Sequence, residues 1–124
     1  MRPKILVVDD ERSIRMLLQA ALKAYGYSVD SVASTHEAEL KITLVVYSGI
    51  IVDFNMPTED GLSFLRRLHQ HTFNLPTIVM SGRDRHDVQQ QAKDLPITAF
   101  LDKPFELTTL IQVVRETFGA AASM

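Results

Sequence analysis

The sequence predicts an α/β protein in which a parallel β-sheet carries helices on both faces. Five short apolar runs alternate with stretches of helical period along the 124 residues. The runs are rich in β-branched residues and nearly continuous, as in strands that are buried on both sides. Parallel neighbours need a crossover connection, and a helix is the usual one. The length suits one domain with a sizeable core.

The first half of the chain contains two strand–helix units. A strand is expected over residues 4–8 (KILVV), and an acidic cluster ends it. Apolar residues at i, i+3, i+4 and i+7 then predict an amphipathic helix over 13–25, with Gly26 as its C-terminal stop. Alternation over 27–33 predicts a half-buried strand. The next helix is capped by Ser34 or Thr35 and runs to about residue 46.

The second half continues the alternation with three more units. A strand over 49–52 ends at Asp53 and opens into the turn-rich segment FNMPTEDG, and a leucine-marked helix follows. A fourth run, 77–80, precedes a polar helix expected over 84–93. After a short strand over 99–101, Pro104 is expected to open the last helix. The apolar stripe of that last helix is Leu107, Leu110, Ile111, Val114 and Phe118.

Composition narrows the classes of function. Lys plus Arg number 13 and Asp plus Glu number 15, so the net charge of −2 gives no reason to expect contact with nucleic acid or a membrane surface. There is no cysteine, which excludes disulfides and thiolate sites. No apolar run approaches the length of about 18 residues that a membrane span needs, and no secretory signal is evident, so we expect a cytoplasmic protein. We predict one domain over 1–119, with 120–124 as a tail or the start of a truncated linker.

Polar residues follow four of the five predicted strands. Open parallel sheets bind ligands at the carboxyl ends of their strands, which makes these positions the ones to search. The search returns Asp9, Asp10 and Glu11 after the first strand, Asp53 after the third, Ser81 after the fourth and Lys103 after the fifth. Carboxylates, a hydroxyl and an ammonium on one edge form a more specific pattern than any one of them alone.

The predicted cluster has a definite chemistry. Two carboxylates about 4 Å apart repel by about 4 kcal/mol at an effective dielectric constant of about 20. The cluster therefore needs a cation, or a raised pKa. Oxygen ligands favour a hard ion such as Mg²⁺, and Lys103 suits a transferring phosphoryl group. A carboxylate that attacks phosphorus in such surroundings forms an aspartyl phosphate.

Each residue also has a plain structural interpretation. Asp9 and Asp10 can cap the first helix, and Asp53 can be a turn residue. Ser81 can be the N-cap of a helix, and Lys103 can be a surface lysine before a helix-starting proline. The four histidines have no metal-site spacing and are expected on the surface: His36, His69, His71 and His86.

Four motifs together resemble the receiver domain of bacterial two-component response regulators. They are VVDDE at 7–11, DFNMPTEDG at 53–61, Ser81-Gly82, and FLDKPF at 100–105. The resemblance covers nearly the whole chain. It implies a doubly wound (βα)₅ flavodoxin-like sandwich, with a five-stranded parallel sheet in the order 2-1-3-4-5 and helices on both faces.

The resemblance also assigns a role to each site residue. Asp53 would be the phosphoacceptor and, with Asp10 and the backbone carbonyl of Asn55, a ligand of Mg²⁺. Asp9 would hold a metal-bound water. Lys103 would pair with Asp53 or its phosphate. Ser81 and Phe100 would be the switch residues.

The implied function is that of a signalling phosphoacceptor and not of an enzyme with a turnover of its own, although the domain assists its own phosphorylation and dephosphorylation. The donor would be a histidine kinase or a phosphotransfer protein. The readout would be a downstream protein or a fused output domain, with a phosphorylation-dependent dimer through the last two helices and fifth strand as one form. Arg83, two residues after Ser81, occupies a position that influences phosphoryl lifetime in the family.

Three other functions remain as alternatives. A phosphohydrolase with an aspartyl-phosphate intermediate usually places two aspartates at alternate positions on one strand, whereas here the acids divide between two strands. A pure interaction module would have lost phosphorylation, but the five residues that phosphorylation needs in this family are all present: Asp9, Asp10, Asp53, Ser81 and Lys103. A nucleotide-binding domain would need a glycine-rich loop where this chain has acids.

Overall fold

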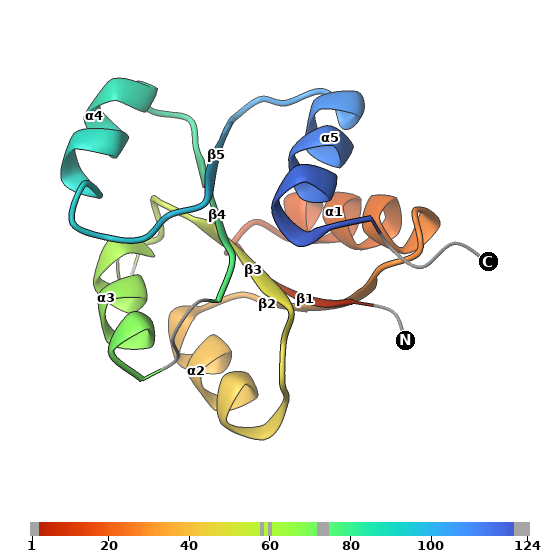
Figure 1. Cartoon of the computed structure of the whole chain (residues 1–124), viewed down its shortest axis with the longest axis horizontal. Coiled ribbons are helices and arrows are strands. Elements are labelled where there is room, and N and C mark those ends of the chain that lie inside the picture. Colours follow the sequence, from red (N-terminus) through yellow and green to blue (C-terminus); the bar gives the residue numbers. More distant parts are fainter. Residues whose placement is uncertain (1–2, 58, 60, 72–74, 121–124) are drawn as a thin grey trace.

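The computed structural model describes residues 3–57, 59, 61–71 and 75–120. Within these residues, five strands alternate with five helices from the first strand to the last helix (Figure 1). The strands are β1 (Lys4–Val8), β2 (Ser28–Val32), β3 (Gly49–Asp53), β4 (Thr77–Ser81) and β5 (Ala99–Asp102). The helices are α1 (Arg12–Ala24), α2 (Thr35–Leu44), α3 (Gly61–His71), α4 (Arg85–Gln91) and α5 (Leu107–Phe118).

All strand pairs in the described sheet are parallel, and the order is β2-β1-β3-β4-β5. The predicted fold class and strand order are therefore confirmed. Helices α1 and α5 cover one face of the sheet, and α2, α3 and α4 cover the other (Figure 1). Strand order reverses between β1 and β3, which is the point where doubly wound sheets open a crevice for ligands.

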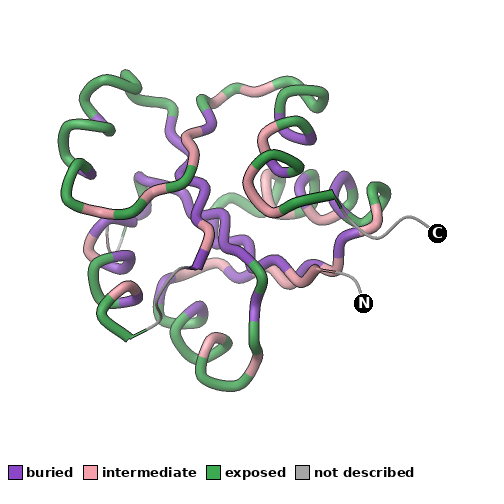
Figure 2. The backbone as a smooth tube through the Cα atoms, in the orientation of Figure 1, coloured by how far each residue is buried: buried purple, intermediate pink, exposed green. Residues whose placement is uncertain are grey.

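Two separate apolar cores fill the space on either side of the sheet. Successive side chains of a strand point to opposite faces, so Leu6 and Val8 pack toward α2–α4 while Ile5 and Val7 pack toward α1 and α5. Every residue of β3 and β4 is buried. Figure 2 shows this as a buried centre surrounded by helices whose outer surfaces are exposed. Burial on both faces explains why these strands are continuous apolar runs.

The predicted boundaries needed two corrections. The last helix begins at Leu107, not at Pro104: the first backbone bond of that helix joins the Leu110 N–H to the Glu106 carbonyl, and the Lys103–Pro104 peptide before it is cis. The fourth helix ends at Gln91, two residues before its predicted end. Few of its side chains are buried, so packing does not extend it further.

Other boundaries agree with the sequence within one or two residues. Gly26 stops α1 as predicted, with φ of 93°, a conformation that glycine adopts without a steric penalty. The predicted tail, 120–124, lies outside the described residues apart from Ala120, and the domain limits stay a prediction. Among the described helices, none has both the length and the apolar character needed to cross a membrane.

Candidate functional site

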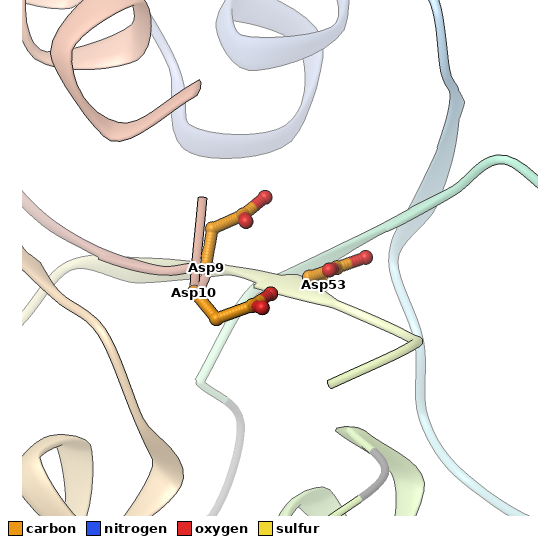
Figure 3. Close-up of side chains that lie close together, drawn as sticks. All are labelled: Asp9, Asp10 and Asp53. Carbon is orange, nitrogen blue, oxygen red and sulfur yellow. The ribbon is translucent and has the colours of Figure 1, made fainter. Parts of the chain in front are cut away.

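Asp9 and Asp53 lie side by side because of the strand register. Val8 of β1 pairs with Val52 of β3, so the next residue on each strand reaches the same level at the carboxyl edge of the sheet. The side chains of both aspartates are almost fully buried, with the two residues 0% and 4% exposed. Two carboxylates in such surroundings repel each other and lose most of their hydration. Figure 3 shows them at the neighbouring ends of the two strands.

Asp10 completes an acidic cluster at the same edge. Its side chain is exposed, and one carboxylate oxygen from each of Asp9, Asp10 and Asp53 lies within 4.8 Å of the others (Figure 3). The donor set consists of oxygen atoms only, which is the chemistry that Mg²⁺ and other hard cations prefer. The residues that the sequence predicted as carboxylate metal ligands are therefore brought together, and their chemistry fits the predicted ion.

Lys103 supplies the positive charge that faces this cluster. Its Nζ lies 2.8 Å from Asp9 Oδ2 and 3.5 Å from Asp53 Oδ1, with Glu11 at 4.0 Å. The side chain is only 16% exposed, so Lys103 is not a surface lysine. The backbone N–H of Lys103 donates to the Ser81 carbonyl at 2.8 Å, which extends the pairing of β5 with β4 to Lys103. Asp53, the partner that the resemblance implied, lies within ion-pair distance of Lys103, and Asp9 lies closer still.

One ammonium does not balance the buried acids. Burial, the largest cause, raises the pKa of the Asp53 carboxyl to about 6; the Lys103 ammonium opposes the rise and the Asp9 carboxylate adds to it. Burial alone would lower the pKa of Lys103, but its hydrogen bond to Asp9 and the nearby acid charges raise it above the usual value. The site therefore favours a second cation, or a proton on Asp53, near neutral pH.

Ser81 lies at the end of β4 and is 4% exposed. Its hydroxyl oxygen accepts a hydrogen bond from the Arg83 N–H at 2.9 Å. Phe54 directly follows Asp53 in the chain, and the guanidinium of Arg83 lies over its ring, 5.5 Å from the ring centroid. Sequence patterns gave no sign of this stacking, because it depends on how the loops after β3 and β4 approach each other.

Asn55 and Phe100 lie around the cluster and not within it. The Asn55 N–H donates to Asp53 Oδ1 at 3.4 Å, a long contact, and its side chain is exposed. Phe100 is half-buried and packs against the core under α2–α4, while its carbonyl accepts a hydrogen bond from Arg85. The roles predicted for both residues stay predictions.

The plain structural interpretations of the site residues largely do not hold. Neither Asp9 nor Asp10 caps α1, whose N-cap is Glu11 with no side-chain capping bond. Asp84, and not Ser81, caps α4 through its side chain. Three histidines are exposed as expected, but His69 is half-buried beside Thr77.

A polar network next to the site was also missed from the sequence. Arg67 of α3 binds the carboxylates of Glu39 on α2 and Glu59 in the loop after β3. Glu59 and Arg67 are eight residues apart, and Glu39 is far from both in the chain. No local spacing rule links the three, so only the packing of α2 against α3 reveals the network.

The fold and the acidic edge together define a receiver-type domain of the chemotaxis-regulator kind. Residues 5–115 match the family model described as the response regulator receiver domain. This match covers most of the chain, and the protein belongs to that family.

The curated relatives include two transcriptional regulatory proteins. The chain is 33% identical over 112 residues to the transcriptional regulatory protein PmrA of Pectobacterium parmentieri. It is 34% identical over 112 residues to the transcriptional regulatory protein BasR of Escherichia coli K12. Each alignment covers 90% of this chain and 50% of the relative, so the chain spans about half the length of these relatives.

Solved structures agree with the family assignment. The chemotaxis protein CheY4 of Vibrio cholerae superimposes with a TM-score of 0.90 at 28% identity, covering 94% of this chain and 99% of that one. The receiver domain of the Francisella response regulator 1452 gives a TM-score of 0.84 at 29% identity, covering 92% and 94%. The fold is therefore the CheY-like form of the flavodoxin-like sandwich.

Proposed function

We propose that this domain accepts a phosphoryl group on Asp53 from a histidine kinase or a histidine-containing phosphotransfer protein. The observation that carries this proposal is the buried Asp53 carboxylate, held beside Asp9 and Asp10 with Lys103 as the nearby cation. A nucleophilic carboxylate, a cluster of oxygen donors and a lysine are the parts that phosphoryl transfer to an aspartate requires.

The transfer exchanges one bond to phosphorus for another. An Asp53 carboxylate oxygen forms a bond to phosphorus while the nitrogen–phosphorus bond of the donor's phosphohistidine breaks. The bonding electron pair remains on the imidazole nitrogen, which then takes up a proton. Lys103, 3.5 Å from Asp53 Oδ1, offsets the negative charge on the phosphoryl oxygens, and the Ser81 hydroxyl donates a hydrogen bond to one of them.

Mg²⁺ fits the oxygen donors at this edge. Asp10, Asp53 and the Asn55 carbonyl would bind the ion directly, and Asp9 would support it from the next layer. When bound, the ion supplies positive charge that keeps Asp53 ionised and neutralises the incoming phosphoryl group. Asp9 already holds Lys103 at 2.8 Å, so this buried carboxylate orients the lysine toward the acceptor.

The signal would leave through a change in a protein-interaction surface. Ser81 ends β4 and Phe100 lies on the adjoining β5, so a shift of the hydroxyl toward the phosphoryl group reaches the β5 edge and the last two helices. Relatives named as transcriptional regulators are about twice as long as this chain. We therefore propose a fused output domain or a downstream protein as the receiver of the signal, with a phosphorylation-dependent dimer through α4, β5 and α5 as one form of it.

A phosphorylation assay tests this function. The protein is incubated with phosphoramidate in the presence of either Mg²⁺ or a chelator. The fraction of phosphorylated protein is then measured by intact-mass spectrometry. We expect one phosphoryl group per molecule with Mg²⁺ and almost none with the chelator. Asp53→Asn should remain unmodified, whereas Asp94→Asn, which changes an exposed aspartate paired with Arg66, should behave as the parent.

The same assay separates a signalling domain from a phosphohydrolase. A signalling domain accumulates a stoichiometric label and releases phosphate slowly. Sustained release of many phosphates per molecule from a phosphate ester would contradict the proposal, and so would labelling that survives in Asp53→Asn.

A further inference from the structure

In the loop between β3 and α3, the structure describes residues 54–57 and 59, among them Asn55, and the residues at its two ends meet beside the acceptor residue. The Gly61 N–H donates to the Phe54 carbonyl at 3.0 Å, which joins the two ends of the loop. A Cβ atom on Gly61 would lie 2.5 Å from the Asp53 carbonyl oxygen, so this closure requires glycine. The path of the loop therefore bears directly on the geometry around Asp53.

The two halves of this loop are held by different forces. In the first half, Phe54 and Met56 are buried in the core under α2–α4, and Asn55 lies between them with an exposed side chain. In the second half, the structure describes Pro57, which is exposed, and Glu59. Apolar burial anchors the first half, and the described anchor of the second half is the carboxylate of Glu59.

Four residues form what we term the Glu59 latch: Thr35, Glu39, Glu59 and Arg67. Glu59 Oε1 accepts a hydrogen bond from Thr35 Oγ1 at 2.6 Å and one from Arg67 Nη2 at 2.9 Å. Glu59 Oε2 accepts a bond from Arg67 Nη1 at 2.5 Å. Arg67 also binds Glu39 through Nε at 3.1 Å. The latch joins the loop to the first turn of α2 and to the middle of α3.

The latch has more structure than an ordinary surface ion pair. Arg67 and Glu39 are nearly half-exposed, and an isolated pair of that kind contributes little. Glu59 is less exposed, and its partner Thr35 is buried. A paired arginine–carboxylate contact fixes orientation as well as distance. These contacts therefore specify where Glu59 lies relative to α2 and α3.

We propose that the Glu59 latch is a positioning device for the divalent cation, because it keeps the loop in the path that makes the Asn55 carbonyl available as a ligand. This inference rests on the proposed function, which places Mg²⁺ at Asp10 and Asp53. Glu59 and Arg67 are positioning residues, since neither touches the acidic cluster. Residues that orient ligands from the next layer commonly change metal affinity by about tenfold or more when they are removed.

Charge alone predicts a different outcome from positioning. If the latch residues acted through the electric field, removal of the Glu59 negative charge would weaken Mg²⁺ binding, and removal of the Arg67 positive charge would strengthen it. If they act by holding the loop, both removals weaken binding. The sign of the Arg67 effect therefore separates the two explanations.

The chain offers a closely matched control in Arg66. The side chains of Arg66 and Arg67 are 45% and 44% exposed on the same helix, but Arg66 pairs with Asp94 and makes no contact in the latch. Mg²⁺ is titrated by calorimetry into the parent, Arg67→Met, Arg66→Met, Glu59→Gln and the double variant Glu59→Gln/Arg67→Met. Unfolding in urea checks that each variant is folded.

We expect the Mg²⁺ dissociation constant to rise about tenfold in Arg67→Met and in Glu59→Gln, and to change less than about twofold in Arg66→Met. The double variant should bind about as weakly as Arg67→Met, since the two residues act as a unit. Thr35→Val removes one hydrogen bond and no charge, and should give a smaller weakening in the same direction.

Two results would overturn the proposal in distinguishable ways. If the parent binds Mg²⁺ and Arg67→Met binds it equally or more tightly, the latch has no positioning role and the proposed function stands. If the parent itself does not bind Mg²⁺, the metal site of the proposed function is wrong, and the latch proposal is wrong with it.

Discussion

Both edges of the sheet bury polar side chains, but the buried groups are neutral at the edge where the strands begin and charged at the edge where they end. Where the strands begin, the buried Thr77 hydroxyl donates to the Leu75 carbonyl at 2.9 Å, and the Tyr27 hydroxyl donates to the Gly119 carbonyl at 2.6 Å. These donors and acceptors are neutral and matched. The two hydroxyls therefore need no counter-ion.

Where the strands end, the groups are charged and unmatched. Three carboxylates, Asp9, Asp10 and Asp53, lie around one ammonium, that of Lys103. Among the described residues, every buried side-chain nitrogen or oxygen atom has a hydrogen-bond partner, so the contrast is one of charge and not of missing bonds. An edge that is satisfied in hydrogen bonds but unbalanced in charge is stable enough to fold, and still favours a bound cation.

The largest effect should come from removing the Lys103 ammonium, the cation that lies against the Asp9 and Asp53 carboxylates. In Lys103→Met, we expect phosphorylation by phosphoramidate at saturating Mg²⁺ to slow by about a hundredfold, because charge on the phosphoryl oxygens loses a preorganised partner. The rate is measured by intact mass over time. A rate within about twofold of the parent would show that Lys103 is only a structural partner of Asp9.

The second effect concerns stability and pH. Because the pKa of Asp53 is raised to about 6 in the folded protein, the folded protein keeps the Asp53 proton at pH values where the unfolded chain has lost it. The group's contribution is therefore most favourable below its unfolded pKa of 3.8 and is lost as the pH rises through about 6. In a chelator at about pH 8, Asp53→Asn should be about 2 to 3 kcal/mol more stable than the parent, and the gain should shrink toward about pH 4.

Urea unfolding at several pH values measures this difference. Asp30→Asn is the control, because Asp30 on the edge strand β2 already pairs with Tyr47 and Lys4. Its replacement removes those partners and should give no gain in stability at high pH. An equal gain in both variants would mean that Asp53 is not specially destabilised.

The third effect belongs to the neutral edge. Thr77→Val keeps the side-chain shape and removes the hydroxyl that donates a hydrogen bond to the Leu75 carbonyl. This loss should lower the free energy of unfolding by about 1 kcal/mol. Phosphorylation rate and Mg²⁺ affinity should not change. A loss of Mg²⁺ affinity in this variant would contradict the account in which only the edge where the strands end binds the cation.

Much of this contrast could be predicted from the sequence. Strands buried on both faces leave continuous apolar runs, so the polar residues after them stand out, and Asp9, Asp53 and Lys103 were found in this way. The start of the last helix was misplaced because Pro104 is a favourable first residue in isolation, whereas the Lys103 N–H remains bound to β4.

Contacts that depend on packing between elements could not be predicted. Lys103 Nζ lies closer to Asp9 than to Asp53 although β3 lies nearer to β5 than β1 does in the sheet, and no motif encodes that difference. The latch at Glu59 depends on how α2 packs against α3. His69 is half-buried because the end of α3 lies beside Thr77, although its sequence context suggested a surface residue.

The smallest effect should come from the rim of the charged edge. The Arg83 guanidinium lies over the ring of Phe54, the residue after Asp53. We expect this side chain to limit the approach of water to a phosphoryl group on Asp53, so Arg83→Ala should lose phosphate about two- to threefold faster than the parent. The decay of phosphorylated protein after removal of the donor is the measurement. Equal decay rates in the two proteins would remove Arg83 from the site.

Chemical mapping shows directly whether Asp53, at the edge with unbalanced charge, is the phosphoacceptor. An aspartyl phosphate is an acyl phosphate, which borohydride reduces to the alcohol, so the modified aspartate becomes homoserine. After phosphorylation with Mg²⁺, reduction and digestion, mass spectrometry should find homoserine at position 53 and aspartate at positions 9 and 10. Homoserine at position 9 or 10, or at no position in protein that carries a phosphoryl group, would contradict the assignment.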